Sequence, residues 1–184
     1  MYKIFILLAF AVTQIQAQKR YEIDKGKIDF TSNAAIELIS GSDEKVQGLV
    51  DPAKNTFAFI VNMKEFSGFN SALQKEHFNE KYLETDKFYQ ATFSGSFIDP
   101  VNYEKEGSYK VQAKGFLTIH GVKQLRTISG TITIEKGKMV IDADFVVPLA
   151  DHGIKIPEIV SQKIATEINV KLKFYMKEKA GKGV

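Results

Sequence analysis

Four segments in the second half of the chain alternate apolar and polar residues with a period of two. They cover residues 109–119, 127–134, 139–149 and 168–177. Successive side chains of a β-strand point to opposite faces, so this alternation predicts long strands with one apolar and one mostly polar face. Less regular strands are expected near residues 21–30, 34–40, 46–50, 56–63 and 91–98. The chain is therefore predicted to be all-β.

Short turn sequences separate these strands. Glu135-Lys136-Gly137-Lys138 is typical of a tight hairpin, and His120-Gly121 predicts another turn. Two segments interrupt the alternation. The spacing of Ser71 and Gln74 fits a capping box and predicts a short helix over about residues 71–80. The segment near 157–166, which begins with a proline, is expected to be a short helix or an irregular loop.

The number and length of the strands favour a barrel. Several run to ten residues or more, which is longer than the strands typical of an immunoglobulin-like sandwich. We therefore expect an extended, antiparallel barrel of about eight strands. One strand face carries Lys110, Lys114, Asp142 and Asp144, which predicts a charged outer wall and an apolar interior. No stable membrane insertion is expected, because such a wall is incompatible with lipid.

The first residues have the layout of a secretory signal. A short basic start precedes an apolar run of nine residues, Ile4 to Val12, well short of the ~20 residues that span a bilayer. A more polar stretch then ends at Ala17, after which we expect cleavage. Residues 1–17 are thus predicted to be a signal peptide and residues 18–184 a single domain. The expected localisation is periplasmic or secreted.

Composition excludes several kinds of site. The chain has no cysteine, so it can form neither a disulfide nor a thiolate metal site. Its net charge of +3 is too small to predict nucleic acid as a partner. The three histidines, His77, His120 and His152, lack the spacing of metal ligands, and no G-x-S-x-G elbow is present. We expect no catalytic residue, no metal and no cofactor other than a lipid-like ligand.

The inward faces of the predicted strands mix small and large residues. Small residues on several strands could open a lumen for a long apolar chain, or could taper the barrel while large residues fill it. The pattern leaves both possibilities open. Strand parity and the aromatic residues near the predicted helix indicate these lumen and portal positions: Phe57, Phe59, Phe66, Phe69, Leu73, His77, Phe78, Phe93, Phe97, Ala113, Gly115, Leu117, Ile132, Ala143, Phe145, Leu172 and Phe174.

Three motifs, in order, resemble the YceI-like family. The first runs from His77-Phe78-Asn79 through Tyr82-Leu83-Glu84-Thr85-Asp86-Lys87-Phe88 to Ala91-Thr92-Phe93. The second is Gly115-Phe116-Leu117-Thr118-Ile119-His120-Gly121-Val122, and the third runs from Phe145 to Pro148 and on through Asp151-His152-Gly153-Ile154. The resemblance extends from about residue 21 to 175. One departure is Tyr89, where the family usually has proline.

This resemblance implies a lipocalin-like barrel in an exported bacterial protein. It also implies a carrier or scavenger, not an enzyme, that holds a long-chain isoprenoid, an isoprenoid quinone or a fatty-acyl lipid in its lumen. A homodimer is an expectation from family analogy alone. Two alternatives stay open: an enzyme that acts on a small lipophilic substrate with His77 or His120 as its base, and a filled barrel that binds a partner through its surface.

Overall fold

A computed structural model describes residues 19–179, so the predicted signal peptide lies outside the described residues. Nine strands dominate this part of the chain, as the alternation predicts. They are β1 (Arg20–Asn33), β2 (Leu38–Asp43), β3 (Gln47–Asp51), β4 (Thr56–Asn62), β5 (Gln90–Phe97), β6 (Gly107–Ile119), β7 (Val122–Glu135), β8 (Lys138–Pro148) and β9 (Glu167–Lys179). The helical segments are η1 (Met63–Glu65), α1 (Ala72–His77), η2 (Phe78–Tyr82), η3 (Leu149–His152) and η4 (Glu158–Val160).

The strands close into an antiparallel barrel. Strands β3 to β9 pair in chain order, and β9 pairs with β1 to complete the wall. Strands β2 and β3 lie along the same edge of β1, one on each half, so the closed wall has eight strand positions. This confirms the predicted lipocalin-like barrel. The strand expected at residues 34–40 begins only at Leu38, because Ala34 N donates to Glu37 O and closes a turn there.

Two tight hairpins connect the longest strands. The turn between β6 and β7 contains His120 and Gly121, with φ of 50° and 73°. The turn between β7 and β8 contains Lys136 and Gly137, also with φ of 50° and 73°. Two consecutive positive φ values are those of a type I′ turn, whose twist matches that of the flanking strands. These turns confirm the tight hairpin predicted at Glu135–Lys138 and the turn predicted at His120-Gly121.

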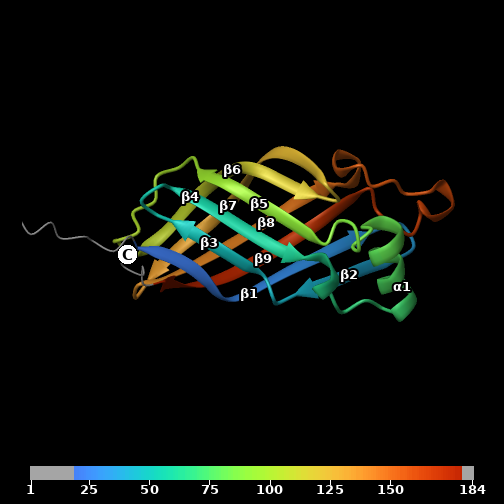
Figure 1. The fold of residues 1–184 in the computed structure, drawn as a ribbon, viewed down its shortest axis with the longest axis horizontal. Helices are drawn as coiled ribbons and strands as arrows, with labels where there is room; N and C mark the ends of the chain where they lie inside the picture. Colours follow the sequence, from blue (N-terminus) through green and yellow to red (C-terminus); the bar gives the residue numbers. More distant parts are fainter. Residues whose placement is uncertain (1–18, 180–184) are drawn as a thin grey trace, which may run out of the picture.

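The barrel is elongated, and its two ends differ (Figure 1). One end, which we call the helix end, carries α1, η2 and the segment from η3 to β9 (Figure 1). The other end, the hairpin end, carries the β7–β8 turn.

The segment near 157–166 is expected from the sequence to be a short helix or an irregular loop. It contains only the single 3₁₀ turn of η4 and is otherwise irregular. Among residues 19–179, no helix is long and apolar enough to cross a bilayer.

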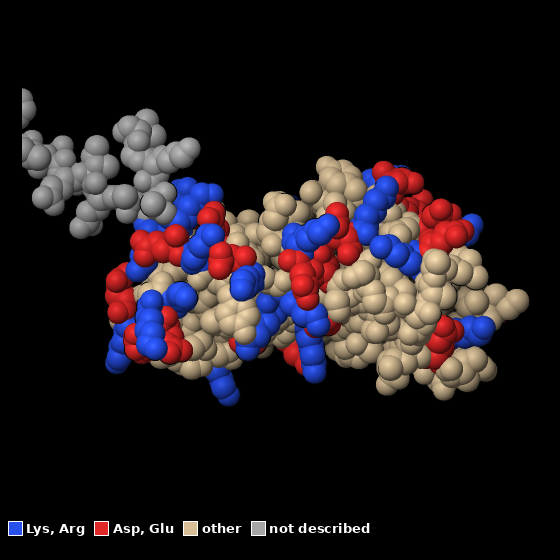
Figure 2. All heavy atoms as spheres, turned by 90° about the horizontal axis from the view of Figure 1, so that it is seen from below, with Lys and Arg blue, Asp and Glu red and all other residues tan. Residues whose placement is uncertain are grey.

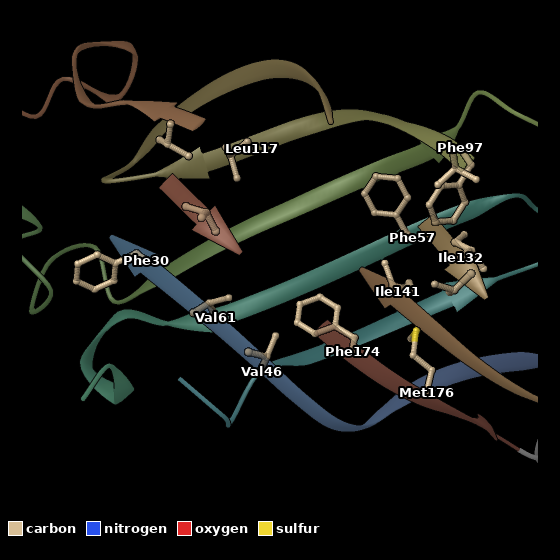
Figure 3. Close-up of a cluster of buried hydrophobic side chains, with 14 of the residues drawn as sticks. Phe30, Val46, Phe57, Val61, Phe97, Leu117, Ile132, Ile141, Phe174 and Met176 are labelled. Carbon is tan, nitrogen blue, oxygen red and sulfur yellow. The ribbon is translucent and has the colours of Figure 1, made fainter. Parts of the chain in front are cut away.

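Large side chains fill the interior towards the hairpin end (Figure 3). Phe57 contacts Phe97 with ring centroids 5.0 Å apart, and Phe59 contacts Phe174 at 5.2 Å. Ile132 on β7 and Met176 on β9 are buried in the same cluster. Close packing of this kind leaves few voids larger than a water molecule. This half of the barrel is therefore a packed core.

Charged residues cover much of the outer wall (Figure 2). On β9, Lys171 and Lys173 pair with the β8 carboxylates Asp144 and Asp142 at 3.3 and 3.4 Å. Further along β9, Lys177 pairs with Asp24 at 2.7 Å. These contacts follow from the register of the strands, since Asp142 lies opposite Lys173 and Asp144 opposite Lys171. The lysines of β9 are thus paired with carboxylates on both neighbouring strands, β8 and β1.

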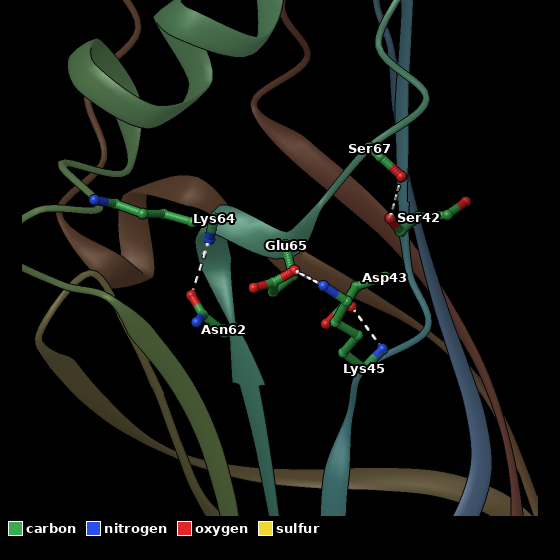
Figure 4. Close-up of polar contacts among 7 residues, drawn as sticks. All are labelled: Ser42, Asp43, Lys45, Asn62, Lys64, Glu65 and Ser67. Carbon is green, nitrogen blue, oxygen red and sulfur yellow. Dashed lines mark hydrogen bonds and ion pairs between the residues drawn. The ribbon is translucent and has the colours of Figure 1, made fainter.

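At two places in the barrel wall the backbone pairing between strands stops, and side chains connect the neighbouring segments there. Strand β7 pairs with β6 from Val122 to Ile134 but with β8 only from Gly130 onward. Arg126 bridges the resulting seam: its guanidinium donates to Val146 O at 2.8 Å and to Asp151 at 3.2 Å. A second junction lies between β2 and the chain after β4, where Ser42 and Ser67 exchange backbone hydrogen bonds of 2.8 and 2.9 Å. There the Ser67 hydroxyl also donates to Ser42 O at 3.4 Å (Figure 4).

Replacing Arg126 with methionine should loosen the β7–β8 seam. The change removes the donors to Val146 O while keeping an apolar stem of similar length, and we expect a loss of about 1–2 kcal/mol in the free energy of unfolding. Hydrogen exchange should accelerate over residues 122–129. Lys110→Met is the control, because it removes an exposed charge from β6 at a position opposite Thr131, outside the measured segment. Unchanged exchange in the Arg126 variant would show that the seam does not depend on this side chain.

Candidate functional site

A cavity of about 470 Å³ occupies the barrel towards the helix end. Its wall is mostly apolar and includes side chains from β1, from β4 to β9 and from the helical segments. Among its aliphatic residues are Ile28, Val61, Val111, Ile119, Ile128, Val147, Leu149, Ile154, Ile164, Ile168 and Val170. The cavity lies within the range of volumes typical of small-molecule sites. The barrel is thus filled in one half and hollow in the other.

Most of the lumen and portal positions predicted from the sequence line this cavity. They are Phe59, Phe66, Leu73, His77, Phe78, Phe93, Phe97, Ala113, Leu117, Ala143, Phe145, Leu172 and Phe174. Whether they contact a ligand stays a prediction. Phe57 and Ile132 do not line it, because they belong to the packed hairpin half. Phe69 does not line the cavity either, and it packs against the rings of Phe30 and Phe78.

Gly115 has a different role from the one its parity predicts. It does not line the cavity, and it lies directly opposite Gly95 in the β5–β6 ladder. A Cβ atom at Gly115 would be 2.3 Å from Ser94 O, and one at Gly95 would be 2.1 Å from Lys114 O. Both glycines therefore permit a close approach of two backbones. Ala113 and Ala143, in contrast, do border the hollow half.

Much of the cavity wall contributed by β1 does not follow from the alternation of its residues. Ile28 and Phe30 line the cavity, yet the alternation along this strand is weak. A register shift between Ile23 and Lys25 explains why: residues 21 and 23 face inward before it, and residues 26, 28 and 30 after it. A bulge of this kind shifts the parity of a strand by one residue. Only the pairing of β1 with β9 shows where the shift occurs.

Aromatic rings form a cluster where α1 meets the barrel. Phe30 of β1 stacks on Phe78 with centroids 5.3 Å apart, and Phe66 contacts Phe30 at 5.2 Å. The helix begins as predicted, since Ser71 Oγ accepts from Gln74 N at 3.1 Å. It continues past His77 as the π-helical turn η2, which ends at Tyr82. The cap and the ring contacts together hold α1 over the helix end of the cavity.

Polar side chains on the cavity wall gather at the helix end. Ser32, at the end of β1, is only 2% exposed. Glu37 follows in the turn before β2, and its carboxylate accepts from Gln74 Nε2 at 2.9 Å. His77 of α1 and Lys163 of the segment before β9 also border the cavity. We call these five residues the polar rim. The sequence offered no signal for it, because its members come from three separate segments.

His120 and His152 lie near the cavity but do not line it. His120 Nε2 is 2.7 Å from a Glu84 carboxylate oxygen, and its Nδ1 is 3.3 Å from His152 O. His152 is fully buried, and its Nδ1–H donates to Val122 O at 3.1 Å. Within residues 19–179, no cluster of three or more metal-ligating side chains occurs. Both histidines therefore tie the β6–β7 turn to neighbouring segments.

The burial of His152 should make stability depend on pH. Burial lowers the pKa of its imidazole below the ordinary value of 6.5. The unfolded chain therefore binds a proton more readily, so the free energy of unfolding should fall as pH drops below 6.5 and through the lower folded-state pKa. Urea unfolding between pH 7.5 and 5 measures this slope. His152→Asn, which keeps a donor near Val122 O, should flatten it. An equally steep slope in that variant would assign the effect to other groups.

Comparisons with known proteins point to one family. A model of the YceI-like domain matches residues 21–176. The fold resembles that of a polyisoprenoid binding domain from Saccharophagus degradans implicated in plant cell wall breakdown. The TM-score is 0.72 and the identity 13%, over 89% of this chain and 100% of that chain. Burkholderia cenocepacia BcnA gives a TM-score of 0.68 at 17% identity, over 82% of this chain and 95% of that chain.

A further similarity is to the Campylobacter jejuni YCEI protein. The TM-score is 0.54 and the identity 16%, over 100% of this chain and 92% of that chain. Among curated proteins, none matches the sequence. The structural similarities establish a shared fold, and the domain match covers nearly all of the described chain. This protein therefore belongs to the YceI-like family.

Proposed function

We propose that this protein is an exported carrier or scavenger of a lipid with a long apolar chain. The ligand classes are an isoprenoid, an isoprenoid quinone and a fatty-acyl lipid. The observation that carries the proposal is the apolar cavity in the helix half of the barrel. Burial contributes ~0.8 kcal/mol per CH₂ group, so ten methylenes contribute roughly 8 kcal/mol before the costs of binding. Burial of the apolar chain is thus the largest favourable contribution that we expect to lipid binding.

Family membership supports the same proposal. The Saccharophagus degradans domain with this fold is described as polyisoprenoid binding. The start of the sequence, with its short apolar run before Ala17, supports export to the periplasm or beyond. The alternative of a filled barrel is opposed by the cavity. The proposed enzymatic use of His120 is opposed by its position, since it contacts Glu84 and does not border the cavity.

Organic extraction of the purified mature protein, residues 18–184, followed by mass spectrometry tests the proposal. We expect a stoichiometric isoprenoid, quinone or fatty-acyl species. Because the expression host can lack the natural ligand, delipidated protein should also be incubated with palmitic acid and with farnesol, and then examined by native mass spectrometry. Absence of bound lipid in the extract and with both probes would contradict lipid binding in the lumen.

A further inference from the structure

The polar rim lies at one end of an otherwise apolar cavity. Three hydrogen bonds join its segments. Ser32 Oγ accepts from Ala165 N at 2.9 Å, Ile36 N donates to Gln162 O at 3.0 Å, and Gln74 Nε2 donates to Glu37 at 2.9 Å. The end of β1, the helix α1 and the segment before β9 are thereby held side by side. The residues of the polar rim are therefore held in place by hydrogen bonds between these segments.

Ser32 has a donor that the protein does not use. Ser32 is buried, with 2% of the residue exposed, and it borders the cavity. Its oxygen accepts from Ala165 N, but within residues 19–179 its own hydroxyl hydrogen has no acceptor. A buried donor without a partner is unfavourable, because it has lost its hydrogen bond to water and gained none in the protein. A ligand oxygen at this position would remove that cost.

The charged residues of the polar rim also favour a ligand group that accepts hydrogen bonds. Glu37 is held by Gln74, so its carboxylate is partly satisfied within the protein. Lys163 borders the cavity, and among the described residues no carboxylate lies within 4.0 Å of its amine. An ammonium group offers three donors and no acceptor. Ser32 and Lys163 therefore both present hydrogen-bond donors that a ligand oxygen can accept.

We propose that the polar rim is a head-group site for a carbonyl or carboxylate oxygen. The proposal rests on lipid binding in the lumen and adds the orientation of the lipid and the chemistry of its polar end. The oxygen accepts from the Ser32 hydroxyl, and a carboxylate also gains from Lys163. The apolar chain then extends from the helix end towards the packed hairpin half. A lipid without such an oxygen leaves the Ser32 donor unpaired.

Ligands of matched chain length test this site. Delipidated protein is titrated with heptadecane, heptadecan-2-one and palmitic acid, and the bound fraction is measured by equilibrium dialysis. The ketone should bind about five to ten times more tightly than the hydrocarbon, which is the effect of one additional hydrogen bond. Ser32→Ala should abolish this preference and leave the affinity for heptadecane unchanged. Ser32→Thr, which keeps the hydroxyl, should restore it.

A second variant, Lys163→Gln, tests the contribution of the ammonium group. It should weaken palmitic acid about threefold relative to the ketone while leaving the ketone unchanged. Equal affinities for ketone and hydrocarbon in the unaltered protein would overturn the head-group site, and so would a Ser32→Ala variant that keeps the preference. If none of the three ligands binds, lipid binding in the lumen fails instead. Retained heptadecane binding separates the two results and shows that Ser32→Ala has not disturbed the cavity.

Discussion

Replacing Gly115 with alanine is expected to destabilise the barrel by about 3 kcal/mol, at the upper end of what overpacking costs. The added Cβ would be 2.3 Å from Ser94 O and 3.0 Å from Gly95 Cα. Both are backbone atoms of β5, so the clash can be relieved only if the β5–β6 ladder separates. Urea unfolding followed by circular dichroism measures the effect, because the chain has no tryptophan for fluorescence.

Gly26→Ala is the matched control for this prediction. A Cβ atom there would meet Ile23 Cγ2 and Phe174 Cδ1, both at 3.1 Å. These are side-chain atoms, which can shift by a few tenths of an ångström, so the loss should be about 1 kcal/mol. If the two variants were equally stable, the close approach of β5 and β6 would not limit the residue at position 115. A destabilised Gly115 variant would also show that the backbone of β5 is what requires glycine at this position.

Replacing Ala143 with phenylalanine should abolish most of the lipid binding without unfolding the protein. Ala143 borders the cavity, and a phenyl ring there would occupy space that a ligand chain needs. Displacing two methylenes from the lumen costs roughly 1.6 kcal/mol. That is more than a tenfold loss in affinity, and a whole ring displaces more than two methylenes. The affinity for palmitic acid, measured by equilibrium dialysis, should therefore fall at least tenfold.

Ser96→Phe is the control for the lumen variant. Ser96 lies on the exposed face of β5, so the same ring is added to the outside of the barrel. It should leave both affinity and the urea midpoint close to those of the unaltered protein. Equal affinities in the two phenylalanine variants would place the ligand outside the lumen. An Ala143→Phe variant that fails to fold would show that the hollow half cannot accept a ring.

The long strands show how far a local pattern can be followed. In β6 to β9, every second side chain faces the interior, and the two hairpins keep that parity from one strand to the next. The pattern therefore predicts which face of each strand is buried. It does not predict how far along the strand the lumen is open. Ile132 and Ala143 share the inward parity, yet only Ala143 borders the cavity.

The strand alternation, the two turns, the Ser71 cap and the motifs of the family can be predicted from sequence, because each depends on residues close together in the chain. Three other features depend on contacts between distant segments, so they are visible only in the folded chain. The bulge in β1 depends on its pairing with β9, and the role of Gly115 depends on the backbone opposite it. The polar rim needs β1, α1 and the segment before β9 to meet at one end, and only closure of the barrel brings such distant segments together.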